Sequence, residues 1–362
     1  MAGKHHRGEQ NHHAGQSAFV PSGRGILAGA ITFVVPLIIL GLVGWTLTIL
    51  LPDQWFNTAT LPLLDSDQAD LQRFALDINA RVNFSIWSVV VWLAAAVGAG
   101  LAFIILRHTL NATAAVVGLI MAIAVGLSIG FCFSRSNYVT CEKPSGAMPA
   151  RISVDVSKGF REVVIDNIMC RFELATSTKA ATLAKTEAMI EVNTLIGFAG
   201  AAAVMAAFAG LAMWNDSGPD VTRLRRRLDD FRTLALMGSV LFVLNALVTR
   251  SLVTWTQGMI ASSKEVDQFS PLSNALLNGW AAESSAVFFG VIAFAAVFLY
   301  CQIKWAARAA ERSNAEKDFD EAKWKTTNGL TFETRTVVTT TIGTIAPVLA
   351  APAADLISKM VH

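Results

Sequence analysis

Hydrophobic residues gather in six long runs along the chain, and polar segments separate these runs. The runs are Ile26–Leu51, Ile86–Leu106, Ala114–Phe133, Thr194–Trp214, Leu234–Trp255 and Ser285–Ile303, and Arg250 is the one charged residue within them. An apolar stretch of about 18 residues or more can cross the roughly 30 Å hydrocarbon core of a bilayer as a helix. The pattern predicts an all-α polytopic membrane protein with six transmembrane helices, which form three hairpins.

Composition and charge distribution support this prediction and add an orientation. Hydrophobic residues make up 53% of the 362 residues and charged residues 15%, whereas soluble domains carry about 25% charged residues. Cytoplasmic loops of membrane proteins are enriched in lysine and arginine. These residues concentrate in the N-terminal tail, at Arg107, and in segments 223–232 and 304–325. We therefore expect a multi-pass protein of the plasma (inner) membrane with both termini in the cytoplasm.

A cluster of four arginines precedes the fifth run. Leu224, Leu228 and Phe231 share one face of a helix in this segment, and the Ser217-x-x-Asp220 pattern predicts its N-terminal cap. The segment lacks the interleaved aromatic residues of a nucleic-acid site, and the net charge of +2 indicates no polyanionic partner. We expect contact with anionic lipid headgroups at the cytoplasmic face from the four arginines Arg223, Arg225, Arg226 and Arg227.

The polar segments differ in predicted structure. Residues 1–25 form a disordered cytoplasmic tail, and residues 26–303 form the transmembrane domain. Within it, the loop 135–193 is expected to be a small mixed α/β extracytoplasmic cap, with β-prone segments at 151–156 and 161–169 and a helix at Leu174–Val192. Cys141 and Cys170 in this loop either form a disulfide, as the extracytoplasmic location favours, or are two free surface thiols. Cys132 and Cys301 lie in apolar runs and are expected to be buried, inert thiols.

Residues 304–362 follow the sixth run and are expected to be cytoplasmic. Segment 304–329 reads as a charged helix that ends at Asn328-Gly329. Its narrow apolar stripe, formed by Ala315, Phe319 and Ala322, either binds a cytoplasmic protein partner or sister subunit, or rests on the inner loops of the protein itself. Segment 336–360 is apolar but contains five threonines and two prolines, so an interfacial or re-entrant segment, a seventh span and a soluble element all remain open.

The third run contains a Gly-x-Ser-x-Gly sequence, Gly126 to Gly130. A serine nucleophile needs a base within hydrogen-bond reach, and no predicted span contains a histidine or lysine. An intramembrane serine protease is therefore excluded, and we expect no enzymatic activity, no cofactor and no metal site. The small residues spaced four apart instead predict close helix packing, within one chain or in a homo-oligomer, through Gly118, Ala122, Gly126 and Gly130.

Polar residues in the fifth run are the remaining candidates for function, because polar groups are costly within a membrane. Asn245 and Thr249 share a face with Gly238 and form either a hydrogen-bonding seam or the lining of a polar pathway. Arg250 either reaches the outer headgroups or contacts a transported anion. The sequence thus predicts a pore-forming or passive-transport protein that forms a homo-oligomer. The alternative is a non-transporting sensor or scaffold, with the cap as receiver and the C-terminal helix as output.

Overall fold

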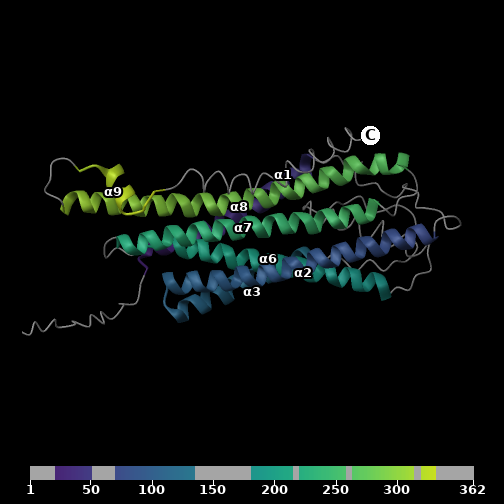
Figure 1. The fold of residues 1–362 in the computed structure, drawn as a ribbon, viewed down its shortest axis with the longest axis horizontal. Coiled ribbons are helices and arrows are strands. Elements are labelled where there is room, and N and C mark those ends of the chain that lie inside the picture. Colours follow the sequence, from purple (N-terminus) through teal and green to yellow (C-terminus); the bar gives the residue numbers. More distant parts are fainter. Residues whose placement is uncertain are drawn as a thin grey trace, which may run out of the picture.

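The computed structural model describes residues 21–50, 70–134, 181–214, 220–257, 263–313 and 319–331, and every regular element in these ranges is a helix. The long helices lie side by side as an elongated bundle (Figure 1). The helices are α1 (Gly23–Leu50), α2 (Asp70–Thr109), α3 (Ala112–Ser134), α6 (Ala181–Ala212), α7 (Val221–Gln257), α8 (Ser263–Ser313) and α9 (Glu321–Thr327).

Six of these helices are long and apolar enough to cross a bilayer, and each overlaps one of the six predicted runs. The apolar stretches are Gly23–Leu42, Asn79–Thr109, Ala112–Phe131, Ala188–Ala212, Val221–Leu252 and Val287–Ser313. The predicted six helices of membrane-spanning length and apolarity are thereby confirmed. They indicate an integral, multi-pass membrane protein.

Several helices extend well beyond the predicted spans. Helix α2 has 40 residues and α8 has 51, so at 1.5 Å per residue they reach about 60 Å and 75 Å. The polar segment before the second run is helical from Asp70, and the segment before the sixth run is helical from Ser263. Extending an existing helix avoids the cost of nucleation, which explains why these polar flanks continue the spans.

Helix α6 lies at the centre of the bundle, where it contacts α1, α2, α3, α7 and α8 (Figure 1). Ala203, Ala207, Phe208 and Leu211 of α6 are completely buried. Its small residues allow close approach by neighbours: a Cβ on Gly200 would lie 2.8 Å from Ala95 Cβ of α2. The interior of the bundle is therefore a packed core built around one helix of small and apolar residues.

The predicted mixed α/β cap is not supported, because the described residues contain no strand and the described part of the loop, from Ala181, is helical. The two β-prone segments and the Cys141–Cys170 pair lie outside the described residues. One cysteine prediction was wrong: Cys301 is exposed on α8, on an outer surface shared with exposed Val297 and Tyr300. A bundle surface that faces lipid can expose apolar side chains, which explains why a thiol in an apolar run need not be buried.

The predicted C-terminal helix is divided. Helix α8 ends at Ser313, and α9 is a separate helix of 7 residues. The predicted stop at Asn328-Gly329 is confirmed, since Asn328 is the C-cap of α9 and Gly329 adopts φ 68°. Segment 336–360 lies outside the described residues.

Candidate functional site at the basic end of the bundle

One end of the bundle collects most of the described basic residues. Here α1, α7 and α9 begin and α2, α6 and α8 end; for example, Ser22 N before α1 donates a hydrogen bond to Trp214 O after α6 (3.0 Å). We name this region the basic end. Its described cations are Arg24, Arg107, Arg223, Arg225, Arg226, Arg227, Arg232, Lys304, Arg308, Arg312, Lys323 and Lys325, and its described carboxylates are Asp220, Asp229, Asp230, Glu311, Asp320 and Glu321. Cations thus outnumber carboxylates two to one.

The arginine segment is the first part of α7. The Asp220 carboxylate accepts hydrogen bonds from the backbone N–H groups of Thr222 (2.9 Å) and Arg223 (3.4 Å), so Asp220 is the N-terminal cap. The predicted apolar face is confirmed. Leu224, Leu228 and Phe231 are buried, and the Phe231 ring packs edge-on against Phe208 of α6, with ring centroids 5.7 Å apart.

Arg227 differs from the prediction that all four arginines contact lipid headgroups, because it is buried, with 3% of its surface exposed. Its guanidinium Nη1 donates to the backbone oxygen of Met213 and to Gln302 Oε1 (2.7 Å). Gln302 Nε2 in turn donates to the backbone oxygens of Leu211 (3.3 Å) and Ala212 (3.2 Å). Arg227 and Gln302 therefore cap the C-terminus of α6 from α7 and α8.

The physical reason lies in the end of α6. The last carbonyl groups of a helix have no partner within the helix and carry a partial negative charge. The end of α6 is enclosed by neighbouring helices, so these carbonyls need donors from the protein rather than from water. A guanidinium supplies several donors and a positive charge at this position. The burial of Arg227 is thereby explained.

The other three arginines of the cluster are exposed. Arg223 and Arg226 lie on the open side of α7, and the Arg225 side chain passes over Gly329, with its Nε 3.2 Å from the position of a Cβ on that glycine. Their contact with lipid headgroups remains a prediction.

Residues 319–331 form a compact segment, which we name the clip. The Asp320 carboxylate caps the start of α9 by accepting from Ala322 N (2.9 Å) and Lys323 N (3.1 Å). At the other end, Leu330 N donates to Lys325 O (2.8 Å) and Gly329 N to Thr326 O (3.1 Å). This is the Schellman arrangement, which favours glycine at the left-handed position.

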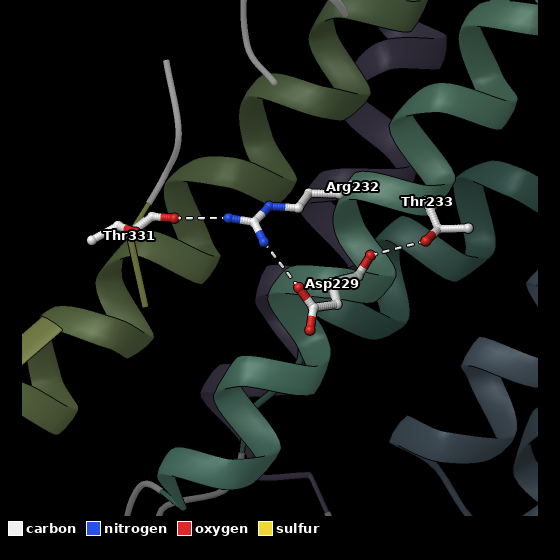
Figure 2. Close-up of polar contacts among 4 residues, drawn as sticks. All are labelled: Asp229, Arg232, Thr233 and Thr331. Carbon is white, nitrogen blue, oxygen red and sulfur yellow. Dashed lines mark hydrogen bonds and ion pairs between the residues drawn. The ribbon is translucent and has the colours of Figure 1, made fainter. Parts of the chain in front are cut away.

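The clip is docked on the bundle. Leu330 is 1% exposed and belongs to the main core together with residues of α7 and α8. Figure 2 shows the polar contact beside it: Arg232 of α7 donates to the backbone oxygen of Thr331 (2.9 Å) and forms an ion pair with Asp229 (2.9 Å). Lys325 Nζ lies 5.3 Å from the centre of the Tyr300 ring of α8. The clip therefore bridges α7 and α8.

These contacts bear on the predicted apolar stripe. Phe319 packs against Trp324 within the clip, with ring centroids 6.4 Å apart, whereas Ala322 is exposed and Ala315 lies outside the described residues. This part of the C-terminal segment rests on helices of its own chain. The binding of a cytoplasmic partner through 304–329 remains a prediction.

The polar residues of the fifth span lie away from the basic end. Asn245 Oδ1 is 3.5 Å from the position of a Cβ on Gly197 of α6, whereas a Cβ on Gly238 would collide with Phe288 of α8. The Thr249 hydroxyl donates to the backbone oxygen of Asn245 (2.9 Å), and Arg250 is exposed. The structure thus places Gly238 and Asn245 against two different neighbouring helices.

The small residues of α3 that were predicted to share one packing face do not all contact the same neighbour. A Cβ on Gly126 would lie 2.5 Å from Phe198 O, and one on Gly130 would lie 3.3 Å from Leu195 Cα, so both glycines face α6. Ala122 is buried. Gly118 departs from the predicted packing face, because no atom lies within 4 Å of its Cβ position. Each step of four residues rotates a helix position by about 40°, which moves Gly118 about 80° away from Gly126.

Sequence reasoning missed a polar contact between α2 and α6. Asn193 Nδ2 donates to the Ser88 hydroxyl (2.6 Å), and the Trp92 indole N–H donates to Asn193 Oδ1. Ser88 is completely buried. The sequence did hold a signal for this contact. Asn193 directly precedes the fourth apolar run, and the second apolar run contains a serine and a tryptophan spaced four residues apart.

The described residues contain no group of three or more His, Cys, Asp or Glu side chains that could hold a metal ion. The Ser128 hydroxyl of the Gly-x-Ser-x-Gly sequence is exposed and donates to the Ala124 backbone oxygen (2.8 Å). No protein-family model, curated protein or solved structure matches the chain.

Proposed function

We propose that the protein is a non-transporting, non-enzymatic membrane sensor or scaffold whose C-terminal segment is the output element. The observation that carries this proposal is the docking of the clip on α7 and α8 at the basic end. A segment that is capped at both ends, contacts two spans and continues into the rest of the C-terminal region can transmit a change in the bundle to a partner. Loop 135–193 is the proposed receiver.

The packing of the bundle supports a structural rather than a conducting interior. The centre is occupied by α6, whose Phe208 and Leu211 side chains are fully buried. Some polar groups in the described parts of the spans bind one another or their own helix: Asn193 binds Ser88, and the Ser239 hydroxyl donates to Ala235 O (2.8 Å). Polar groups paired in this way stabilise helix contacts. Groups bound in this way are less available for lining a pathway.

We further propose that the basic end faces the cytoplasm at the plasma (inner) membrane, with both termini on that side. The excess of cations over carboxylates at this end supports the orientation, since such residues are retained in the cytoplasm during insertion. A cysteine introduced at Thr327, which is exposed on α9, tests it in a background where the native cysteines are replaced. We expect a membrane-impermeant maleimide to label this cysteine only after cells are opened. Labelling in intact cells would overturn the orientation.

A pore between copies of the chain is the second candidate function. Gly41, Gly100 and Gly118 favour it, because no atom lies within 4 Å of a Cβ on any of them. Exposed glycines on spans allow close approach by another subunit. This candidate requires a homo-oligomer, and its pathway would lie outside the core formed around α6.

Two experiments separate these candidates. In reconstituted vesicles loaded with a potassium-sensitive or small-solute-sensitive dye, the sensor proposal predicts no flux above that of empty vesicles. Flux that depends on the protein would refute it and support the pore. In cells, deletion of residues 319–362 should abolish cross-linking to cytoplasmic proteins while the six spans remain inserted. If every cross-link survived the deletion, the output role would be wrong.

A further inference from the structure

One of the contacts that fix the clip to α7, the hydrogen bond from Arg232 to the Thr331 backbone oxygen, is a contact that a phosphate group can replace. We propose that the clip is releasable, and that a phosphate group of an anionic lipid headgroup releases it by binding Arg232. This proposal rests on the proposed sensor function. The ligand is a lipid phosphate, and the moving element is the clip.

The first step is the nature of the acceptor on the clip. Arg232 donates to a neutral backbone oxygen, that of Thr331, and its side chain remains 28% exposed. Hydrogen bonds between a guanidinium and a charged acceptor are roughly twice as strong as those between neutral groups. A guanidinium also binds phosphate through two parallel N–H donors. A phosphate that reaches Arg232 is therefore a better hydrogen-bond acceptor than the backbone oxygen of Thr331 in the clip.

The second step is the charge of the clip itself. Its described residues include two carboxylates, Asp320 and Glu321, and two cations, Lys323 and Lys325. Glu321 and Lys325 form an ion pair with each other. The described residues of the clip thus carry no net charge, so the clip as a whole is not attracted to α7 by an opposite net charge. An anionic membrane surface, by contrast, attracts every basic residue near it.

The third step is the position of Arg232. It lies two residues before Leu234, the start of the fifth apolar run, and Arg225 lies two helical turns earlier beside Gly329. Basic residues that flank the apolar part of a span lie at the level of the headgroups. Arg232 is therefore at the depth of lipid phosphates, and Asp229 is its ion-pair partner there.

Hydrogen–deuterium exchange tests the proposal on the full-length protein in lipid nanodiscs. We expect slow exchange of the Gly329 and Leu330 amides in phosphatidylcholine, and at least tenfold faster exchange when phosphatidylglycerol is added. Inorganic phosphate added to phosphatidylcholine nanodiscs forms a separate arm. If it accelerates exchange equally, soluble phosphate is the ligand rather than a headgroup, and the lipid assignment is overturned. Equal exchange in both lipids, without an effect of phosphate, would overturn the release.

Three variants make the result specific. Leu330→Asp should undock the clip and give fast exchange in both lipids; if exchange of the wild type in phosphatidylcholine were already as fast, the docked state would be wrong. Arg232→Gln should remove the dependence on phosphatidylglycerol, whereas Lys323→Gln, which loses the same charge at an exposed position, should retain it. If Arg232→Gln kept the tenfold response, Arg232 would not be the phosphate site. The vesicle flux assay tests the proposed sensor function and does not depend on any of these exchange measurements. Failure of the sensor proposal can therefore be distinguished from failure of clip release.

Discussion

Replacing Arg227 with methionine tests the capping of α6 directly, because methionine has a similar length and no hydrogen-bond donor. The substitution removes the bonds to the Met213 backbone oxygen and to Gln302 Oε1. Both acceptors are then left without this donor at a buried position. The neighbouring Arg226 is exposed on the same turn of α7, and Arg226→Met is a matched control.

The expected loss of stability follows from these contacts. A hydrogen bond to a charged group contributes about 1.5–3 kcal/mol, so two such bonds amount to roughly 3–6 kcal/mol. Burying a guanidinium also costs free energy, and methionine removes that cost. We therefore expect Arg227→Met to lower the free energy of unfolding by about 2–4 kcal/mol. Arg226→Met should change it by less than about 0.5 kcal/mol.

Equilibrium unfolding in mixed micelles of dodecyl sulfate and a non-ionic detergent, followed by far-UV circular dichroism, measures these differences. A double-mutant cycle with Gln302→Leu isolates the direct contact, and side chains in one hydrogen-bonded network show coupling of about 0.5–3 kcal/mol. The reasoning is refuted if Arg227→Met is no more destabilising than Arg226→Met. It is also refuted if the Arg227 and Gln302 substitutions are additive.

The remaining predictions concern packing, the membrane-embedded polar contact and the clip. Gly126→Ala should destabilise the bundle by about 1–3 kcal/mol, because its Cβ would overlap α6; Gly118→Ala, with open space, should be neutral or stabilising in the same unfolding assay. Asn193→Leu should cost about 1–2 kcal/mol through loss of two interhelical hydrogen bonds, and no loss would show that the contact does not form. The Lys325 side chain lowers the pKa of Glu321; this ion pair therefore stabilises α9 above the ordinary glutamate pKa and loses its effect as pH falls through the lowered pKa. Clip amides, corrected for intrinsic exchange, should lose protection on acidification, and Glu321→Gln should remove that dependence.

The sequence was sufficient to predict features that depend on local periodicity. The burial of Leu224, Leu228 and Phe231 follows from their spacing, and the end of α9 follows from Asn328-Gly329. The six spans follow from uninterrupted apolar length. Each of these features needs only the geometry of one helix and the polarity of its surroundings.

Features that depend on the relative placement of helices could not be predicted. Gly118 and Gly126 belong to the same four-residue spacing, yet only Gly126 faces α6. The spacing specifies neither where the partner helix crosses α3 nor how far along α3 the contact extends. The clip is a similar case: the predicted stripe of Ala315, Phe319 and Ala322 left open whether a partner or the same chain was met, and the residue that docks is Leu330, which the stripe did not include.

Arg227 shows why a charge pattern alone does not predict the contacts of each basic residue. The positive-inside rule counts basic residues without regard to direction, so Arg226 and Arg227 have equal weight in it. Their environments differ because α6 ends beside α7, and the enclosed carbonyls at the end of α6 need donors from side chains that can reach them. Arg227 therefore contributes to the packed structure as well as to the charge count on which the proposed orientation rests, whereas exposed Arg226 makes no such buried contact. It follows that the two substitutions should have equal effects on membrane orientation and unequal effects on unfolding, a separation that neither hydropathy nor charge counting can produce.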